Sequence, residues 1–317
     1  MRNNIAGILL TVFLVVGCGG KKKAEQFSAL PFPDISLPSM IQGQQEAADY
    51  FAEHLWDRLT DSERGFPSDS VLVSGVRKED VEQKFANWVN ILEMTSLEVS
   101  EKAVDRLCGR SLACEIADTA SNVLETVADL ADKYLHDPNS PYRNEEYYLY
   151  FARNFAGYDV FPEEIRDRYA YQARMCALNR PGTISSDFRF ADSRGRVRSL
   201  HAVEAPYTLL FFSNPGCEAC MGIIEMLKNE QKVSDMISAG SLAVLNIYID
   251  EDIAAWMDYM PIYPENWYNG FDPDMVIRMD NLYNVRAIPS LYLLDKEKRV
   301  ILKDAPENKV MSYLMNL

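Results

Sequence analysis

Two cysteines three residues apart, Cys217 and Cys220, have the residue type and spacing for thiol–disulfide chemistry. They follow the apolar residues 207–212, and residues 221–230 after them have the pattern of an amphipathic helix. A buried strand that leads into C-x-x-C at the start of a helix is the layout of a redox-active pair. The free N–H groups and the dipole of such a helix stabilise a thiolate on the first cysteine. We therefore expect Cys217 to attack a partner disulfide and Cys220 to resolve the mixed disulfide.

A zinc half-site and a purely structural disulfide are the alternative interpretations of this pair. Zinc would need a second C-x-x-C or a Cys/His pair, and the sequence contains neither. Two of the three histidines, His54 and His136, stand far from each other and from any cysteine cluster. The sequence therefore predicts no metal and no separate cofactor, only a redox-active disulfide between Cys217 and Cys220.

The dipeptide Ile288-Pro289 is the second feature that indicates thiol–disulfide chemistry. Proline at the start of an apolar run cannot occupy the middle of a sheet, because it has no N–H to donate. Together with the C-x-x-C pair, this position predicts a cis peptide bond, and an ordinary trans proline at a strand start is the alternative. A cis bond would expose the backbone of Ile288 beside Cys217, where an extended substrate can pair as an added strand.

Residues 182–317 have the periodicity needed to hold these groups. Alternating residues and buried-type apolar runs predict strands, and a helical pattern occurs over residues 221–230 and again near the end. The predicted elements are a hairpin over residues 188–197, strands over 207–212, 241–249, 285–295 and 299–302, and a closing helix over 308–317. About 35 residues rich in Trp, Tyr and Pro intervene after residue 250, and no element is assigned to them.

Residues 40–180 have helical periodicity instead, and we expect an all-helical domain with its own core. The predicted helices cover residues 48–59, 81–92, 116–135, 144–155 and 163–178. Asn144 is expected to cap the fourth of them. The aromatic residues 147–155 are interpreted as core rather than as a ligand groove. No catalytic constellation is found in this domain.

Three cysteines fall within the helical domain. Cys108 and Cys114 would lie about 9 Å apart along one unbroken helix, which is too far for a disulfide. Gly109 could break the helix and let them meet, so a bridge and two separate thiols both remain open. Cys176 is interpreted as a small core residue.

The N-terminus predicts export. Arg2 precedes the apolar residues 5–16, a run too short to span a bilayer, and Gly17-Cys18 follows. This pattern resembles a bacterial lipobox, so we expect a lipoprotein signal peptide over residues 1–17 and lipidation of Cys18. Residues 18–39 would then form a tether. A plain secretory signal with an incidental cysteine is the alternative.

The predicted export and the composition limit where the chain can be located and which partners it can have. The expected location is the cell envelope, with the lipid in the inner or outer membrane and the chain facing the periplasm. That compartment permits disulfides. A net charge of −15 argues against nucleic acid as a partner.

The motifs resemble the thioredoxin superfamily. The C-x-x-C after a strand is joined by R-A-I-P-S-L-Y-L-L-D at residues 286–295. The spacing F-x-F-x-D-x-x-G-x-x-x-S-L from Phe188, and the insert that follows residue 249, resemble the membrane-attached TlpA-like thiol–disulfide oxidoreductases over residues 182–317. Residues 40–180 are similar to a domain of unknown function that precedes thioredoxin modules in some bacterial lipoproteins.

The resemblance implies an α-helical N-terminal domain plus an α/β thioredoxin-like C-terminal domain, whose mixed central sheet is flanked by helices. It also implies that Cys217 and Cys220 are the redox pair and that Pro289 is the cis-proline.

The sequence departs from the family pattern around the cysteines. Asn-Pro-Gly precedes Cys217 without the common tryptophan, and Glu-Ala separates the cysteines without the common proline. Phe211 and Ile223 occupy the positions where relatives keep a buried carboxylate. Glu225 is a nearby candidate, with an exposed helix glutamate as the alternative, so proton transfer is expected to use water. The charge of Glu218 should weaken thiolate stabilisation and disfavour a strongly oxidising potential.

The sequence therefore predicts an enzyme, a membrane-anchored thiol–disulfide oxidoreductase that acts mainly as a reductase. Its expected partners are extracytoplasmic cysteine-containing proteins or small thiols, and an upstream electron donor. A peroxiredoxin would need threonine three residues before the reactive cysteine, where Asn214 stands. The alternative from a different class is a binding or scaffold lipoprotein, whose helical domain recognises a partner beside a passive thioredoxin-like module.

Overall fold

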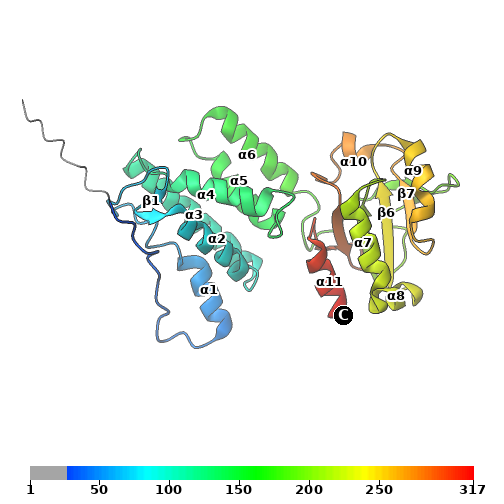
Figure 1. The fold of residues 1–317 in the computed structure, drawn as a ribbon, viewed down its shortest axis with the longest axis horizontal. Coiled ribbons are helices and arrows are strands. Elements are labelled where there is room, and N and C mark those ends of the chain that lie inside the picture. Colours follow the sequence, from blue (N-terminus) through cyan, green and yellow to red (C-terminus); the bar gives the residue numbers. More distant parts are fainter. Residues whose placement is uncertain (1–26) are drawn as a thin grey trace, which may run out of the picture.

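The computed structural model describes residues 27–317, which form two bodies side by side along the long axis of the molecule (Figure 1). The N-terminal body is built mainly of helices, and the C-terminal body surrounds a sheet. The predicted signal peptide over residues 1–17 and the predicted lipidation site Cys18 lie outside the described residues. Among the helices described, none is long and apolar enough to cross a membrane.

The helices of the N-terminal body, which we call the helical domain, pack around one apolar core. They are α1 Gln44–His54, α2 Lys78–Leu92, α3 Leu97–Ala117, α4 Val123–Ala131, the π-helical turn η1 Asp132–His136, α5 Glu145–Ala156 and α6 Glu163–Cys176. Asn144 caps α5 as predicted, because its side chain accepts hydrogen bonds from the N–H groups of Glu146 and Tyr147.

The prediction that this domain is all-helical is wrong in one respect. The strands β1 Leu72–Val73 and β2 Val76–Arg77 form a small antiparallel hairpin. Ser74 and Gly75 between them both have positive φ, at 47° and 80°. Such a two-residue turn matches the twist of the strands it joins, so this sequence favours a hairpin here.

The single helix predicted over residues 116–135 is also wrong, because the chain forms two helices there. α3 ends at Ala117 and α4 begins at Val123. Between them the carboxylate of Asp118 accepts the N–H of Ala120 at 2.9 Å. A local side-chain bond of this kind competes with helical hydrogen bonding and interrupts the helix.

The cysteines of the helical domain are free thiols within the described part of the chain, and all are buried. Cys108 and Cys114 lie on α3, which Gly109 does not interrupt, so the interpretation as separate thiols is confirmed. Cys176 is a core residue, as predicted. Burial raises the pKa of each of these thiols, which keeps them protonated and unreactive.

Aromatic side chains fill the centre of the helical domain. Phe85 and Phe151 lie with their ring centroids 6.2 Å apart, and Trp88 contacts both. The indole N–H of Trp88 donates to the carbonyl of Ala52 at 2.8 Å, so this buried polar atom is satisfied. The aromatic residues between 147 and 155 belong to this core, as predicted.

The C-terminal body, which we call the thioredoxin-like domain, is built on a seven-stranded mixed sheet of order β4-β3-β7-β6-β5-β8-β9. The strands are β3 Arg189–Ala191, β4 Val197–Ser199, β5 Tyr207–Phe212, β6 Leu242–Tyr248, β7 Tyr268–Phe271, β8 Ser290–Leu294 and β9 Val300–Leu302. β5 pairs in parallel with β6 and antiparallel with β8, so it lies inside the sheet. β7 was not predicted, because its sequence Tyr-Asn-Gly-Phe is short and half polar.

Successive side chains of β5 alternate between two apolar layers. Leu209 and Phe211 face the layer that holds α7 Glu218–Asn229 and α11 Glu307–Met315. Leu210 and Phe212 face the opposite layer, which holds α10 Val276–Met279. Because both faces of the sheet are covered, residues 209–212 of β5 are all apolar. The remaining helices are α8 Gln231–Ser238, α9 Ile253–Tyr259 and the 3₁₀ turn η2 Met260–Ile262.

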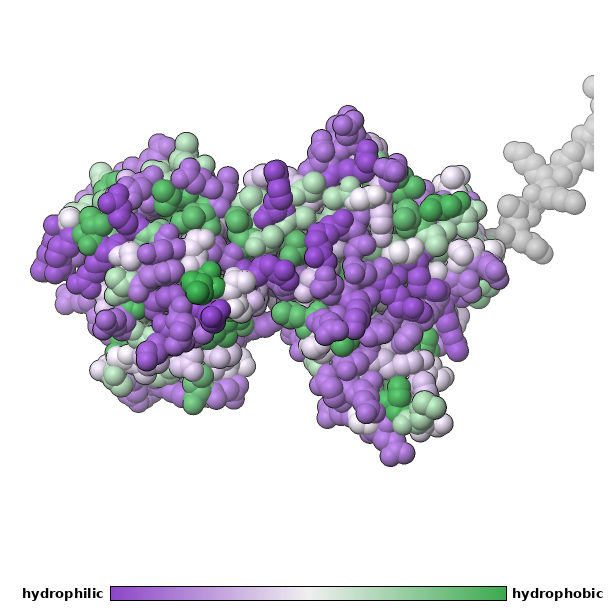
Figure 2. All heavy atoms as spheres, turned by 180° about the vertical axis from the view of Figure 1, so that it is seen from behind, coloured by the Kyte–Doolittle hydropathy of each residue, from purple (hydrophilic) through white to green (hydrophobic). Residues whose placement is uncertain are grey.

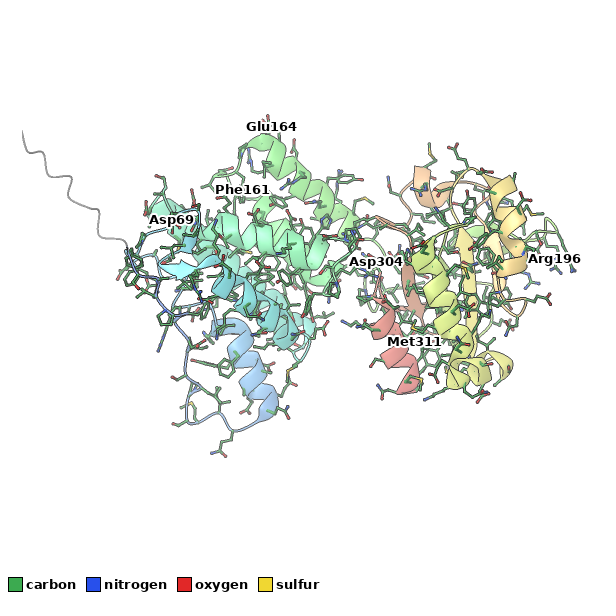
Figure 3. The ribbon with its side chains drawn as sticks, in the orientation of Figure 1. Asp69, Phe161, Glu164, Arg196, Asp304 and Met311 are labelled. Carbon is green, nitrogen blue, oxygen red and sulfur yellow. A yellow bond between two sulfur atoms is a disulfide. The ribbon has the colours of Figure 1, made fainter. Side chains whose placement is uncertain are left out.

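Contacts between the two domains involve charged groups. Lys309 on α11 pairs with Glu93 of the helical domain at 2.6 Å. Arg143 donates to the backbone carbonyls of Asp304 and Ala305 at 3.0 and 3.1 Å. Asp304 lies where the two domains meet (Figure 3). Seen from behind, the outer surface is mainly hydrophilic, with apolar side chains in small scattered groups (Figure 2).

His136 at the end of η1 makes the stability of the fold depend on pH. Its ring stacks on that of Tyr148, with centroids 4.2 Å apart. Burial first, and then the positive charges of Arg286 and Arg168, lower the pKa of His136 to about 4, with a smaller opposite effect from Asp137. The unfolded chain therefore binds a proton near pH 6.5 that the folded chain takes up only near pH 4.

We predict that the free energy of unfolding falls by roughly 2–3 kcal/mol through this group as the pH drops from 6.5 to 4. His136→Phe keeps the stacking and removes the titration. Urea denaturation of both proteins across this range should show a flatter dependence for the variant. The same dependence of the free energy of unfolding on pH in both proteins would show that His136 is not the group responsible.

Candidate active site

The first cysteine of the pair lies at the N-terminus of a helix. β5 ends at Phe212, four residues turn the chain, and Cys217 is the N-cap of α7. Gly216 in this turn has φ of 73°, a conformation that favours glycine. The backbone N–H of Cys220 donates to Sγ of Cys217 at 3.2 Å. This geometry and the helix dipole stabilise negative charge on that sulfur.

The two sulfurs differ in exposure. Cys217 and Cys220 form a disulfide, with their Cα atoms 5.2 Å apart. Cys217 is partly exposed, whereas Cys220 is only 1% exposed and belongs to the apolar layer that includes Ile223 and Ile224. A partner disulfide can therefore approach Cys217 and not Cys220.

The Ile288–Pro289 peptide bond is cis, as predicted. In the antiparallel pairing of β5 with β8, Phe212 is opposite Ser290. The residues that precede Ser290 therefore lie beside those that follow Phe212, at the end of the sheet that carries Cys217. Ile288 and Cys217 are both partly buried against the same apolar layer, so the predicted site residues lie at the same end of the sheet.

The carboxylate positions of the family are apolar in the structure as well. Phe211 is fully buried in β5, and Ile223 is 5% exposed in α7. Glu225 is exposed and pairs with Lys228 at 3.1 Å, which confirms the interpretation as a surface glutamate. None of these three side chains can accept a proton from Cys220.

A buried chain of polar side chains, not predicted from the sequence, begins at Ser213 in the turn that leads to Cys217. The hydroxyl of Ser213 donates to the amide oxygen of Asn246. Asn246 donates to the side chain of Asn269 at 3.0 Å, and Asn269 donates to the carbonyl of Pro264 at 2.8 Å. These bonds tie the end of β5 to β6 and β7. An asparagine inside the otherwise apolar residues 242–249 was the available signal.

A second polar contact holds the cysteine loop from outside. The side-chain amide of Asn214 donates to Asp250 at 2.6 Å, and Asp250 pairs with Arg278. Glu218 is exposed beside Cys217, as its position between the cysteines requires. Within residues 27–317 no group of three or more His, Cys, Asp or Glu side chains is arranged to hold a metal ion.

Comparison with solved structures decides the family. A thioredoxin-like protein from Bacteroides caccae is 33% identical, and the match covers 91% of this chain and 99% of that one, with a TM-score of 0.78. The chain belongs to the thioredoxin-like proteins. A further match is the C-terminal domain of an uncharacterized protein from Bacteroides fragilis, 44% identical over 43% of this chain and 98% of that one, with a TM-score of 0.42.

Structures of thiol–disulfide oxidoreductases are also among the matches. The thioredoxin domain of one from Bacteroides vulgatus is 17% identical over 43% of this chain and 98% of that one, with a TM-score of 0.37. Residues 19–174 match the family of a domain of unknown function, DUF5106. No curated protein matches the chain. The resemblance to the thioredoxin superfamily, with an N-terminal domain of unknown function, is confirmed.

Proposed function

We propose that the chain is a thiol–disulfide oxidoreductase that reduces disulfides of extracytoplasmic proteins or small thiol compounds. The observation that carries the proposal is the asymmetry of the pair. Cys217 is partly exposed and caps the N-terminus of α7, whereas Cys220 is buried. That arrangement suits one attacking thiol and one resolving thiol.

The proposed reaction transfers two electrons from the reduced pair to a partner disulfide. The thiolate of Cys217 attacks one partner sulfur, the partner S–S bond breaks, and the departing partner thiolate takes a proton. Cys220 then loses its proton and attacks the sulfur of Cys217. The mixed disulfide breaks, the second partner thiolate takes a proton, and the oxidised pair awaits an upstream thiol donor.

The proton of Cys220 has to leave without help from a neighbouring carboxylate at Phe211 or Ile223, because both positions are apolar. Water that reaches the partly exposed side of the pair is the proposed acceptor. Ile288 and Pro289 are the proposed substrate-binding residues, where an extended segment pairs with the backbone. Glu218 adds negative charge beside Cys217 and favours the reductive direction.

We predict that the full chain catalyses the reduction of insulin disulfides by dithiothreitol, and that Cys217→Ser abolishes this turnover. Cys114→Ala is the matched control, because this thiol lies outside the pair, and it should keep full activity. The reduction potential should lie below about −200 mV, away from the roughly −120 mV of strong oxidants. A strongly oxidising value would overturn the reductive direction. No thiol-dependent turnover would favour a scaffold whose helical domain recognises a partner.

We also propose that Cys18 carries lipid and holds the chain in the cell envelope, facing the periplasm. Support comes from the apolar run and Gly17-Cys18 in the sequence. In fractionated cells the wild-type chain should sediment with membranes, and Cys18→Ser should move to the soluble periplasmic fraction. Identical fractionation of the two chains would contradict lipid anchoring.

A further inference from the structure

A buried network of charges joins the helical domain to residues 284–290, which we call the cis-proline segment. Glu145, the first residue of α5, has a side chain only 1% exposed. One of its carboxylate oxygens accepts hydrogen bonds from Nε of Arg286 at 2.9 Å and from the side-chain amide of Asn284. The other lies 2.8 Å from Nζ of Lys303.

The same network reaches the residue that directly follows the cis-proline. Asp304, whose side chain is 6% exposed, accepts from Nη2 of Arg286 at 3.2 Å and from the hydroxyl of Ser290 at 2.7 Å. Arg143 of the helical domain donates to the carbonyl of Asp304 at 3.0 Å. The cis-proline segment is therefore held on both sides of Ile288.

Burial makes these contacts interdependent. Arg286 and Lys303 are cations of the thioredoxin-like domain with side chains 14% and 3% exposed. Glu145 is the helical-domain carboxylate that faces both of them. Removal of one partner from such a cluster leaves buried charge uncompensated, so the remaining groups must shift or admit water. Arg286 lies two residues before Ile288, so a change in its contacts acts close to the cis bond.

We propose that Glu145 is a positioning residue for the cis-proline segment, through which the helical domain sets how an extended substrate meets Cys217. The inference rests on the proposed function and adds a role for the helical domain in it. Pairing of a substrate strand with the backbone of Ile288 requires that backbone to be fixed. A small disulfide, which needs no strand pairing, depends only on the thiolate of Cys217.

The test compares two substrates with the full-length chain. Glu145→Gln keeps the size of the side chain and removes its charge. With a disulfide-bonded peptide of about ten residues, we expect kcat/KM to fall roughly tenfold, mainly through a higher KM. With 5,5′-dithiobis(2-nitrobenzoate), a small aromatic disulfide, the rate of reaction with the reduced pair should stay within about twofold.

Two further variants separate positioning from a general loss of structure. Glu93→Gln also removes an interdomain ion pair, with Lys309 of α11. This pair is exposed and is no part of the buried network, so the reaction with both substrates should be unaffected. Ser290→Ala leaves every buried charge paired and removes the hydrogen bond to Asp304. This variant should also raise the KM for the peptide. If Glu145→Gln does not fold, Ser290→Ala tests whether the buried network positions the cis-proline segment.

The outcomes are distinct. A selective loss with the peptide in Glu145→Gln, or in Ser290→Ala where Glu145→Gln does not fold, and none in Glu93→Gln, supports the proposal. Equal loss with both substrates, no loss in the deciding variant, or the same selective loss in Glu93→Gln overturns the positioning role, while the wild-type activity still supports the proposed function. No turnover of either substrate by the wild-type chain would instead overturn the proposed function itself.

Discussion

The placement of the Cys217 sulfur at the N-terminus of α7 is the constraint on which the rest of the structure depends. An ordinary thiol has a pKa near 8.5 and is mostly protonated at neutral pH, so it needs positive polarity nearby to react as a thiolate. α7 supplies that polarity only if Cys217 stays at its N-terminus. β5, hydrogen-bonded on both sides and buried on both faces, fixes the point from which the short turn to Cys217 starts.

The helical domain contacts the thioredoxin-like domain through charged side chains, and each domain has its own apolar core. Domains within one chain usually move relative to one another unless their interface is large and apolar. Here Glu145, Arg286 and Asp304 are buried together, and separation of the domains would break the pairing of Glu145 with Arg286. The segment that carries Pro289 is consequently supported by both domains, which links the helical domain to the proposed chemistry.

The sequence predicted the features that depend on local pattern. Periodicity predicts β5, the helix after it and the hairpin of β3 with β4. The presence of the C-x-x-C pair in the same sequence predicts the cis bond at Pro289. Features that depend on contacts between residues far apart in the chain could not be predicted from the sequence. β7 is recognisable only beside β6 and β3, and Glu145 meets Arg286 across 141 residues of sequence. The buried contacts of Ser213 and Asn246 likewise emerge only when β5 and β6 are paired.

Trapping of the mixed disulfide tests the central claim most directly. The full chain with Cys220→Ser, reduced and mixed with a disulfide-bonded peptide, should form one covalent adduct that dithiothreitol reverses. Peptide mapping by mass spectrometry should place this adduct on Cys217, because the second cysteine is no longer present to release it. The absence of an adduct, or its location on Cys108, Cys114 or Cys176, would contradict the assignment of Cys217 as the attacking thiol.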